Sequence, residues 1–160
     1  MPYKMEIFTD GGCRNNGQPG ATGAAAAVFQ FLNRTQTLTR YLSEAESPTS
    51  QRAELTGIII ALEEALRKYN RLYFYPYLQV TIYSDSQYAV RCMTVWRATW
   101  VQNGWRNSNG DPVANTDLLW EALQLQEEIE KNGVVHYAWI PRTQNTMADA
   151  AVNQRLDQRY

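Results

Sequence analysis

Short runs of apolar residues recur along the chain, and their patterns predict five β-strands. The run GAAAAVFQFL is continuous in small and apolar residues, which suits a strand that packs closely beneath a helix. The run QTLTRYLS alternates instead, with Leu38 and Leu42 on one face and Thr39 and Tyr41 on the other. The predicted strands are Lys4–Asp10, Gly23–Leu32, Gln36–Ser43, Leu78–Tyr83 and Val134–Ile140. Short connections join the first three, which are therefore expected to form an antiparallel meander.

Apolar residues at intervals of three and four indicate helices, most clearly in SPTSQRAELTGIIIALEEALRKYN, which Thr49 or Ser50 can cap. Three other helical regions are predicted. The first starts at Ser86 and continues, after a short connector, in a second piece over Trp96–Gln102. The second runs from Thr116 or Asp117 to a C-cap at Gly133, and the third runs from an Asn145 cap to about Asp157. The order βββαβα(α)αβα indicates an α/β layer architecture with a mixed sheet. Right-handed crossovers would lay the fourth and fifth strands parallel to the first.

The composition is that of one globular domain over residues 1–160, with 44% hydrophobic and 19% charged residues. No apolar run approaches the length of a membrane span, and the N-terminus carries no signal-peptide pattern. These features predict an intracellular protein without membrane contact. Two cysteines in a chain of this length are expected to be reduced thiols.

The net charge of −1 argues at first against a nucleic-acid partner. However, the distribution of charge matters more than its sum. Residues 86–110 contain no acid but include Arg91, Arg97 and Arg106. A basic surface is therefore expected on this segment.

Four acids lie at the ends of predicted elements. Asp10 and Asp85 follow apolar strands, and Glu54 and Asp149 fall in the first turns of predicted helices. Each has an ordinary structural explanation, because Asp is common in turns and an acid near a helix N-terminus gains about 0.3–1 kcal/mol. Gathered at one edge of the sheet, however, four carboxylates would repel unless divalent cations neutralised them. Oxygen ligands favour Mg²⁺ or Mn²⁺, whereas one His and no CxxC pair make zinc a poor candidate.

Four motifs, TDGGCRNNG, TSQRAELTGIIIAL, YSDSQYAV and NTMADAAV, together resemble the type 1 ribonuclease H family over nearly the whole chain. The resemblance implies a ribonuclease H-like fold, a five-stranded mixed sheet of strand order 3-2-1-4-5 flanked by helices. It also implies an endoribonuclease that cleaves the RNA strand of RNA–DNA hybrids, leaving 3′-hydroxyl and 5′-phosphate ends. Two Mg²⁺ ions per active site, replaceable by Mn²⁺, and a monomeric state are part of the expectation.

The resemblance assigns catalysis and metal binding to Asp10, Glu54, Asp85 and Asp149. Asp10 is expected to bridge both metals, with Glu54 and Asp85 completing the shell of the metal near the leaving group. Asp149 is expected to bind the metal that activates the attacking water.

The resemblance also implies contacts with both strands of the hybrid. The positions expected to contact RNA are Cys13, Asn15, Asn16, Ser50 and Gln51. The positions expected to contact DNA are Thr49, Tyr88, Trp96, Trp100 and Asn115. The alternatives are that the asparagines only form a turn and that the tryptophans form a core stripe.

The chain departs from the family pattern in three places. First, it resembles the lineage that lacks a His loop before the last acid. Second, Val101 and Gln102 stand where a Lys cluster is common in the family. Third, Ser47 stands where the family often has an Arg. Two other functions remain as alternatives, namely a catalytically silent hybrid-binding domain and a relative of transposases or integrases. The aromatic segment 69–77 matches none of these functions. It is expected to pack against a core edge, with binding of a partner as the alternative.

Overall fold

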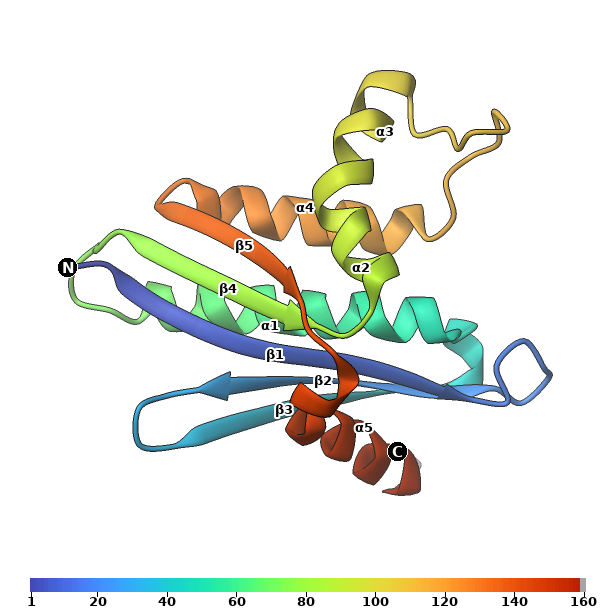
Figure 1. Cartoon of the computed structure of the whole chain (residues 1–160), viewed down its shortest axis with the longest axis horizontal. Helices are drawn as coiled ribbons and strands as arrows, with labels where there is room; N and C mark the ends of the chain where they lie inside the picture. Colours follow the sequence, from blue (N-terminus) through green and yellow to red (C-terminus); the bar gives the residue numbers. More distant parts are fainter. Residues whose placement is uncertain (159–160) are drawn as a thin grey trace.

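The fold is built on a five-stranded sheet of order β3-β2-β1-β4-β5, seen in the computed structural model, which describes residues 1–158 (Figure 1). The strands are β1 (Tyr3–Arg14), β2 (Thr22–Gln30), β3 (Thr35–Leu42), β4 (Leu78–Ser84) and β5 (Gly133–Trp139). β1, β2 and β3 pair antiparallel, and β1, β4 and β5 pair parallel. The predicted meander, the parallel crossovers and the strand order are therefore confirmed.

Helices cover the two faces of the sheet unequally. The helices are α1 (Ser50–Asn70), α2 (Gln87–Arg91), α3 (Arg97–Asn103), α4 (Thr116–Glu130) and α5 (Thr146–Gln158), with short helical turns η1 (Glu44–Glu46), η2 (Cys92–Trp96) and η3 (Arg142–Gln144). α1 and α4 lie on one face and α5 on the other, while α3 projects away from the sheet (Figure 1). Within residues 1–158, no helix has the length and apolar character needed to span a membrane.

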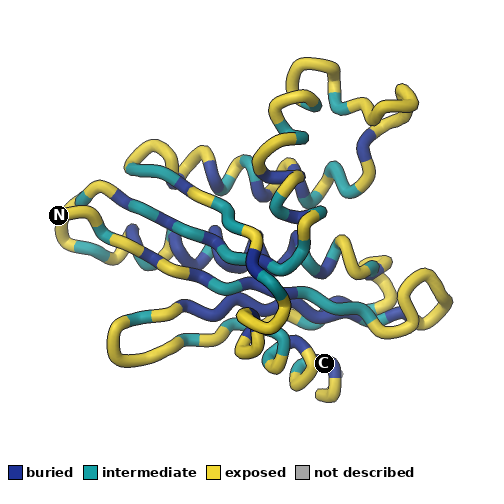
Figure 2. The backbone as a smooth tube through the Cα atoms, in the orientation of Figure 1, coloured by how far each residue is buried: buried dark blue, intermediate teal, exposed yellow. Residues whose placement is uncertain are grey.

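The alanines of β2 let helices approach the sheet from both sides. Ala25 and Ala27 belong to the main core beneath α1, whereas Ala24 and Ala26 pack against Val152 of α5. Because alternate residues of a strand face opposite sides, a run of small residues serves both contacts. Figure 2 shows this buried centre in dark blue, with the exposed backbone concentrated in loops and around α3.

The prediction that Asp10 ends its strand is wrong. β1 continues to Arg14, and Asp10 pairs with Ala26 of β2. The last parallel pair between β1 and β4 joins Thr9 to Ser84. Asp10 therefore lies one residue beyond the point where β4 has ended, because β1 is the longer strand.

Two predicted helix boundaries are also wrong. The connector expected before Trp96 is instead the π-helical turn η2, so that one continuous helical run extends to Asn103. The run contains no Gly or Pro before Gly104, whose φ of 76° ends it. In α4 the C-cap is Lys131 rather than Gly133. Gly133 begins β5, where a Cβ atom would lie 1.8 Å from the carbonyl oxygen of Leu78.

The aromatic segment 69–77 packs only in part. Tyr69 is 1% exposed, and its hydroxyl donates a hydrogen bond of 2.8 Å to the Pro76 carbonyl. Tyr73 is 102% exposed and Phe74 65%, and Tyr75 and Tyr77 are exposed as well. The expectation of packing is therefore right for Tyr69 and wrong for these four side chains.

Candidate active site

Three carboxylates from three elements meet where β4 ends. Asp10 comes from β1, Glu54 from α1, and Asp85 directly follows β4. One oxygen of each lies within 4.8 Å of those of the other two. Asp10 is buried, and Glu54 and Asp85 are half-buried. The close group has the oxygen chemistry and spacing of a site for hard divalent cations.

Asp149 lies in the first turn of α5, as predicted, but it is not part of this close group. The position of Glu54 differs from the prediction, because α1 begins at Ser50 and its first turn contains no acid. A favourable helix dipole, which acts within the first turn, therefore does not explain Glu54.

The electrostatics of the group favour a bound cation. Within residues 1–158, none of the four acids takes part in an ion pair. Burial and the charge of Asp85 raise the pKa of Asp10 from 3.8 to about 7. Burial and the charges of Asp10 and Asp85 raise the pKa of Glu54 well above its usual value, and the charge of Arg142 opposes only part of this rise. The Oε2 atom of Glu54 is buried without a hydrogen-bond partner. These residues fit a metal cofactor, because a cation would satisfy this oxygen and neutralise the group.

Asn145 contacts this group in a way that the sequence did not indicate. It precedes α5, and its carbonyl accepts a hydrogen bond from the Asp149 backbone N–H, as the predicted cap position requires. Its side chain, however, does not cap the helix. The amide nitrogen donates to the Thr9 carbonyl at 2.9 Å and to Oδ2 of Asp85 at 3.3 Å. A cap pattern in sequence cannot reveal this second role, because the partners are 136 and 60 residues away.

The residues predicted to contact RNA gather at the N-terminus of α1. Cys13 lies near the end of β1, and Asn15 and Asn16 lie in the turn that follows. Asn16 Oδ1 accepts a hydrogen bond of 3.3 Å from the Ser50 backbone N–H, which joins the two predicted segments. Ser50 and Gln51 open the helix with exposed side chains. Asn15 has a φ of 59°, so the turn reading of this position is also correct.

The polar residues predicted to contact DNA lie next to this group. The Thr49 hydroxyl accepts a hydrogen bond from the Arg52 backbone N–H, which confirms the predicted cap and leaves its O–H free to donate. Asn115 donates to the Tyr88 hydroxyl at 2.8 Å, and its Oδ1 accepts from Arg52 at 3.4 Å. Arg52, which also forms an ion pair with Asp117, was missed by the sequence reasoning. It belongs to the SQRAE motif, so its charge was the available signal.

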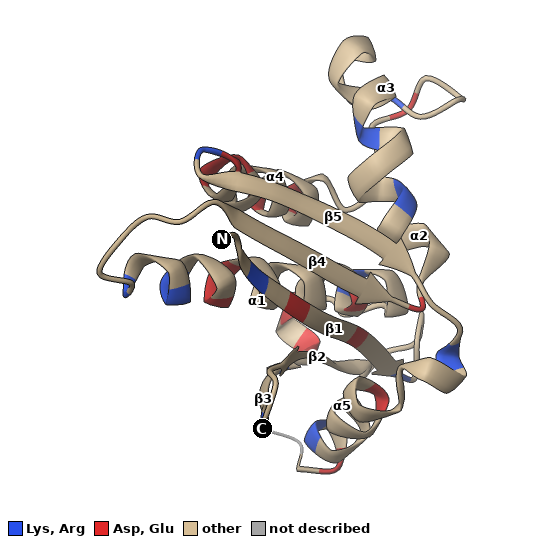
Figure 3. Cartoon of the chain, turned by 60° about the vertical axis from the view of Figure 1, so that its left-hand side comes forward, with Lys and Arg blue, Asp and Glu red and all other residues tan. Residues whose placement is uncertain are grey.

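The aromatic residues of the predicted DNA surface form a continuous row. Ring centroids are 6.0 Å apart between Tyr88 and Trp96, and 5.9 Å apart between Trp96 and Trp100. The row continues through Trp105 to Trp120 with separations of 5.9 and 5.3 Å. These rings are half-buried or exposed, but Tyr88, Trp96, Trp100 and Trp105 pack against the main core, so the core-stripe alternative is correct in part. The helical run from α2 to α3 has two charged residues, Arg91 and Arg97, and Figure 3 shows basic residues without acidic ones along it.

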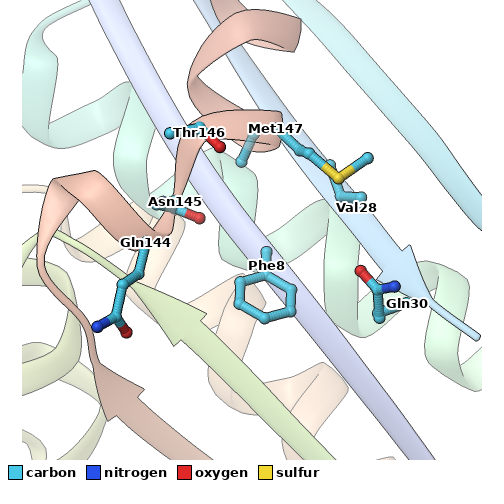
Figure 4. A pocket seen from close by; sticks show the side chains of 8 residues that line it. Phe8, Val28, Gln30, Gln144, Asn145, Thr146 and Met147 are labelled. Atoms are coloured by element: carbon cyan, nitrogen blue, oxygen red, sulfur yellow. The ribbon is translucent and has the colours of Figure 1, made fainter.

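A pocket of about 150 Å³ lies beside the start of α5 (Figure 4). It is lined by Phe8, Val28, Gln30, Gln144, Asn145, Thr146, Met147 and Ala148. None of the four acids lines this pocket. Asn145 lines it and also donates a hydrogen bond to Oδ2 of Asp85.

Comparisons with known proteins agree with this architecture. A family model described as RNase H matches residues 2–157. The chain is 33% identical over 159 residues to Ribonuclease H of Legionella pneumophila, covering 97% of this chain and 98% of the relative. It is 38% identical over 140 residues to Ribonuclease HI of Haemophilus influenzae, covering 88% and 79%. The structure of LC11-RNase H1 in complex with RNA/DNA hybrid has a TM-score of 0.69 at 23% identity, covering 96% of this chain and 97% of that chain, and shares the fold.

Proposed function

The chain belongs to the RNase H family, and we propose that it is an endoribonuclease that hydrolyses the RNA strand of RNA–DNA hybrids. The observation that carries the proposal is the close approach of Asp10, Glu54 and Asp85 without an ion pair among the described residues. Such a group repels itself when ionised, and its arrangement makes sense where divalent cations bind. The family and the fold supply the reaction in which those cations act.

We propose that the cofactor is Mg²⁺, with two ions per site. Asp10 would contribute to both ions, Glu54 and Asp85 to one of them, and Asp149 to the other. When bound, the two ions activate a water molecule and neutralise charge on the scissile phosphate. The protein carries these carboxylates on four separate segments of the chain, and three of them, Asp10, Glu54 and Asp85, already lie close together. Cleavage is expected to leave 3′-hydroxyl and 5′-phosphate ends.

The two neighbouring groups of predicted contact residues, which meet at the N-terminus of α1, suit the two strands of a hybrid. A 2′-hydroxyl both donates and accepts hydrogen bonds, and the amides of Asn16 and Gln51 match it. Next to them, Thr49 and Asn115 are neutral donors for a phosphate oxygen, and Trp96 and Trp100 offer faces for stacking. RNA beside the first group and DNA beside the second is the arrangement we propose. The monomeric state and the intracellular location stay predictions.

Cleavage of an end-labelled RNA–DNA hybrid tests the proposal. In Mg²⁺, the wild-type protein is expected to cut the RNA strand of the hybrid and to leave duplex DNA and duplex RNA intact. Asp10→Asn is expected to abolish cutting. Glu127→Gln serves as the matched control, since Glu127 is an exposed acid of α4 and should be dispensable. End analysis of the products checks the 3′-hydroxyl and 5′-phosphate termini.

Two outcomes would replace the proposal. Hybrid binding without cutting in either Mg²⁺ or Mn²⁺ would identify a silent binding domain. Joining of strands into duplex DNA would instead identify a relative of transposases or integrases.

A further inference from the structure

We propose that Asn145 is a positioning residue that fixes the Asp85 carboxylate and the start of α5 against β1. The inference rests on the proposed function, because it concerns how the carboxylates are held ready for divalent cations. Asn145 is 1% exposed and comes from a fifth place in the chain, between η3 and α5. Its proposed role is exerted through its neighbours.

Three hydrogen bonds connect Asn145 to three of the acid-bearing segments. The side-chain amide donates to the carbonyl of Thr9, the residue before Asp10. The same nitrogen donates to Oδ2 of Asp85. The Asn145 carbonyl accepts from the backbone N–H of Asp149 at 3.1 Å. One residue therefore links β1, the end of β4 and the first turn of α5.

The Thr9 carbonyl explains why a donor is needed here. β4 ends opposite Thr9, and a buried backbone carbonyl without a partner is destabilising by about 1–3 kcal/mol. Asn145 supplies a donor at this position. Because the same amide has two hydrogens, it bonds to Asp85 as well.

The orientation of the amide is determined by its partners. Oδ1 of Asn145 is buried and has no hydrogen-bond partner, and Asn145 lines the pocket in Figure 4. A flip of the amide would turn this oxygen towards the Thr9 carbonyl and the Asp85 carboxylate, which are acceptors only. The two donor contacts therefore hold the side chain in one orientation.

Asp85 is held at two points by different side chains. The indole N–H of Trp139 donates to the Asp85 backbone carbonyl at 3.1 Å, and Asn145 binds Oδ2. Oδ1 of Asp85 has no hydrogen bond within residues 1–158 and stays open to a cation. The arrangement is that of an outer partner that orients a metal ligand, whose loss typically weakens metal affinity 10- to 100-fold.

The test uses Asn145→Ser, with Gln144→Ala as the matched control. Serine is a strong N-cap residue, so the substitution preserves the start of α5. Its shorter side chain cannot reach both Thr9 and Asp85. Gln144 is exposed, lines the same pocket and forms no side-chain hydrogen bond in the described chain. Mg²⁺ binding is measured by titration calorimetry without nucleic acid, and hybrid affinity is measured separately in EDTA.

We expect the Mg²⁺ affinity of Asn145→Ser to fall about 10- to 100-fold, while hybrid affinity stays within about twofold because phosphate and stacking contacts dominate it. A folded Asn145→Ser protein with wild-type Mg²⁺ affinity would overturn the inference. If Asn145→Ser unfolds, the titration is repeated in trimethylamine oxide, which favours the folded state. A wild-type protein that binds no Mg²⁺ would instead contradict the proposed function, so the two failures are distinguishable.

Discussion

Replacing Asp10 by Asn should stabilise the cation-free protein while it removes activity. Burial and the charge of Asp85 raise the Asp10 pKa from 3.8 to about 7, so the folded state resists ionisation of this carboxyl. At about 1.4 kcal/mol per pKa unit, ionisation lowers the free energy of unfolding by up to about 4 kcal/mol above pH 7. Asn has the same shape without the charge, and it can donate to a neighbouring carboxylate. Relaxation and water entry reduce the effect, so we expect a gain of about 2–4 kcal/mol at pH 8.

The sign of the pH dependence follows from the raised pKa. Ionised Asp10 destabilises the fold fully above pH 7, progressively less as the pH falls towards 3.8, and not at all below that value. The advantage of Asp10→Asn should therefore shrink by about half between pH 8 and pH 5.5. Urea unfolding in EDTA, followed by tryptophan fluorescence at both pH values, measures this difference.

Glu127→Gln is the control, because it removes an exposed carboxylate at the same change in net charge. It should alter the free energy of unfolding by less than about 0.5 kcal/mol. Added Mg²⁺ should stabilise the wild-type protein through preferential binding to the folded state, and should stabilise Asp10→Asn much less. An Asp10→Asn protein that is less stable than wild type at pH 8 in EDTA would refute the view that these carboxylates strain the empty site.

The other predictions concern the aromatic row, the sheet and the aromatic segment. Trp96→Ala should weaken hybrid binding by about 1–3 kcal/mol, measured by fluorescence anisotropy in EDTA. Val101→Ala, at an exposed position, should leave hybrid binding unchanged, and equal effects of the two substitutions would contradict a stacking role for Trp96. Gly133→Ala should lower the free energy of unfolding by more than about 2 kcal/mol, because the alanine Cβ would meet the Leu78 carbonyl. The control is Asn132→Ala at an exposed position, and an unchanged stability of Gly133→Ala would show that the strands can separate there. Tyr69→Phe should lower the free energy of unfolding by about 1 kcal/mol through loss of its bond to Pro76, and Tyr73→Phe should have no measurable effect; equal urea midpoints would contradict the role of that hydrogen bond.

Much of the fold could be predicted because hydrophobic period and helix caps are local signals. Thr49, one of the two predicted candidates, caps α1, and the alanines of β2 pack beneath α1 as the run of small residues suggested, although their second contact with α5 was not predicted. The signals failed where a distant backbone decides the outcome. Gly133 looks like a helix C-cap in sequence, but its lack of a side chain is required by the Leu78 carbonyl of a neighbouring strand. The π-helical turn η2 likewise has no local breaker that would predict it.

The prediction of the close carboxylate group also succeeded where the signals are local and failed where distant segments decide the geometry. The acids were found from their positions after strands and within helices, but the reason for their meeting was mistaken for Asp10 and Glu54. Asp10 does not end a strand, and Glu54 is beyond the first turn of α1. Asn145 was recognised only as a cap, because its bonds to Thr9 and Asp85 join segments that are distant in sequence. Local patterns and the family resemblance therefore singled out the acids as candidates, and strand lengths help to determine how Asp10, Glu54 and Asp85 meet.

The unequal lengths of β1 and β4 explain why the site lies where it does. β1 continues beyond Thr9 with only β2 beside it, so Asp10 lies next to a position that β4 has left. Asp85 is the first residue after β4, and Asn145 follows the end of β5, so both chain segments turn into that same position. A β4 longer by two residues would pair with Asp10 and carry Asp85 away from it, whereas a shorter β1 would lose the strand that holds Asp10. The ends of the parallel strands are staggered, and this stagger lets carboxylates from separate elements converge beside one buried backbone.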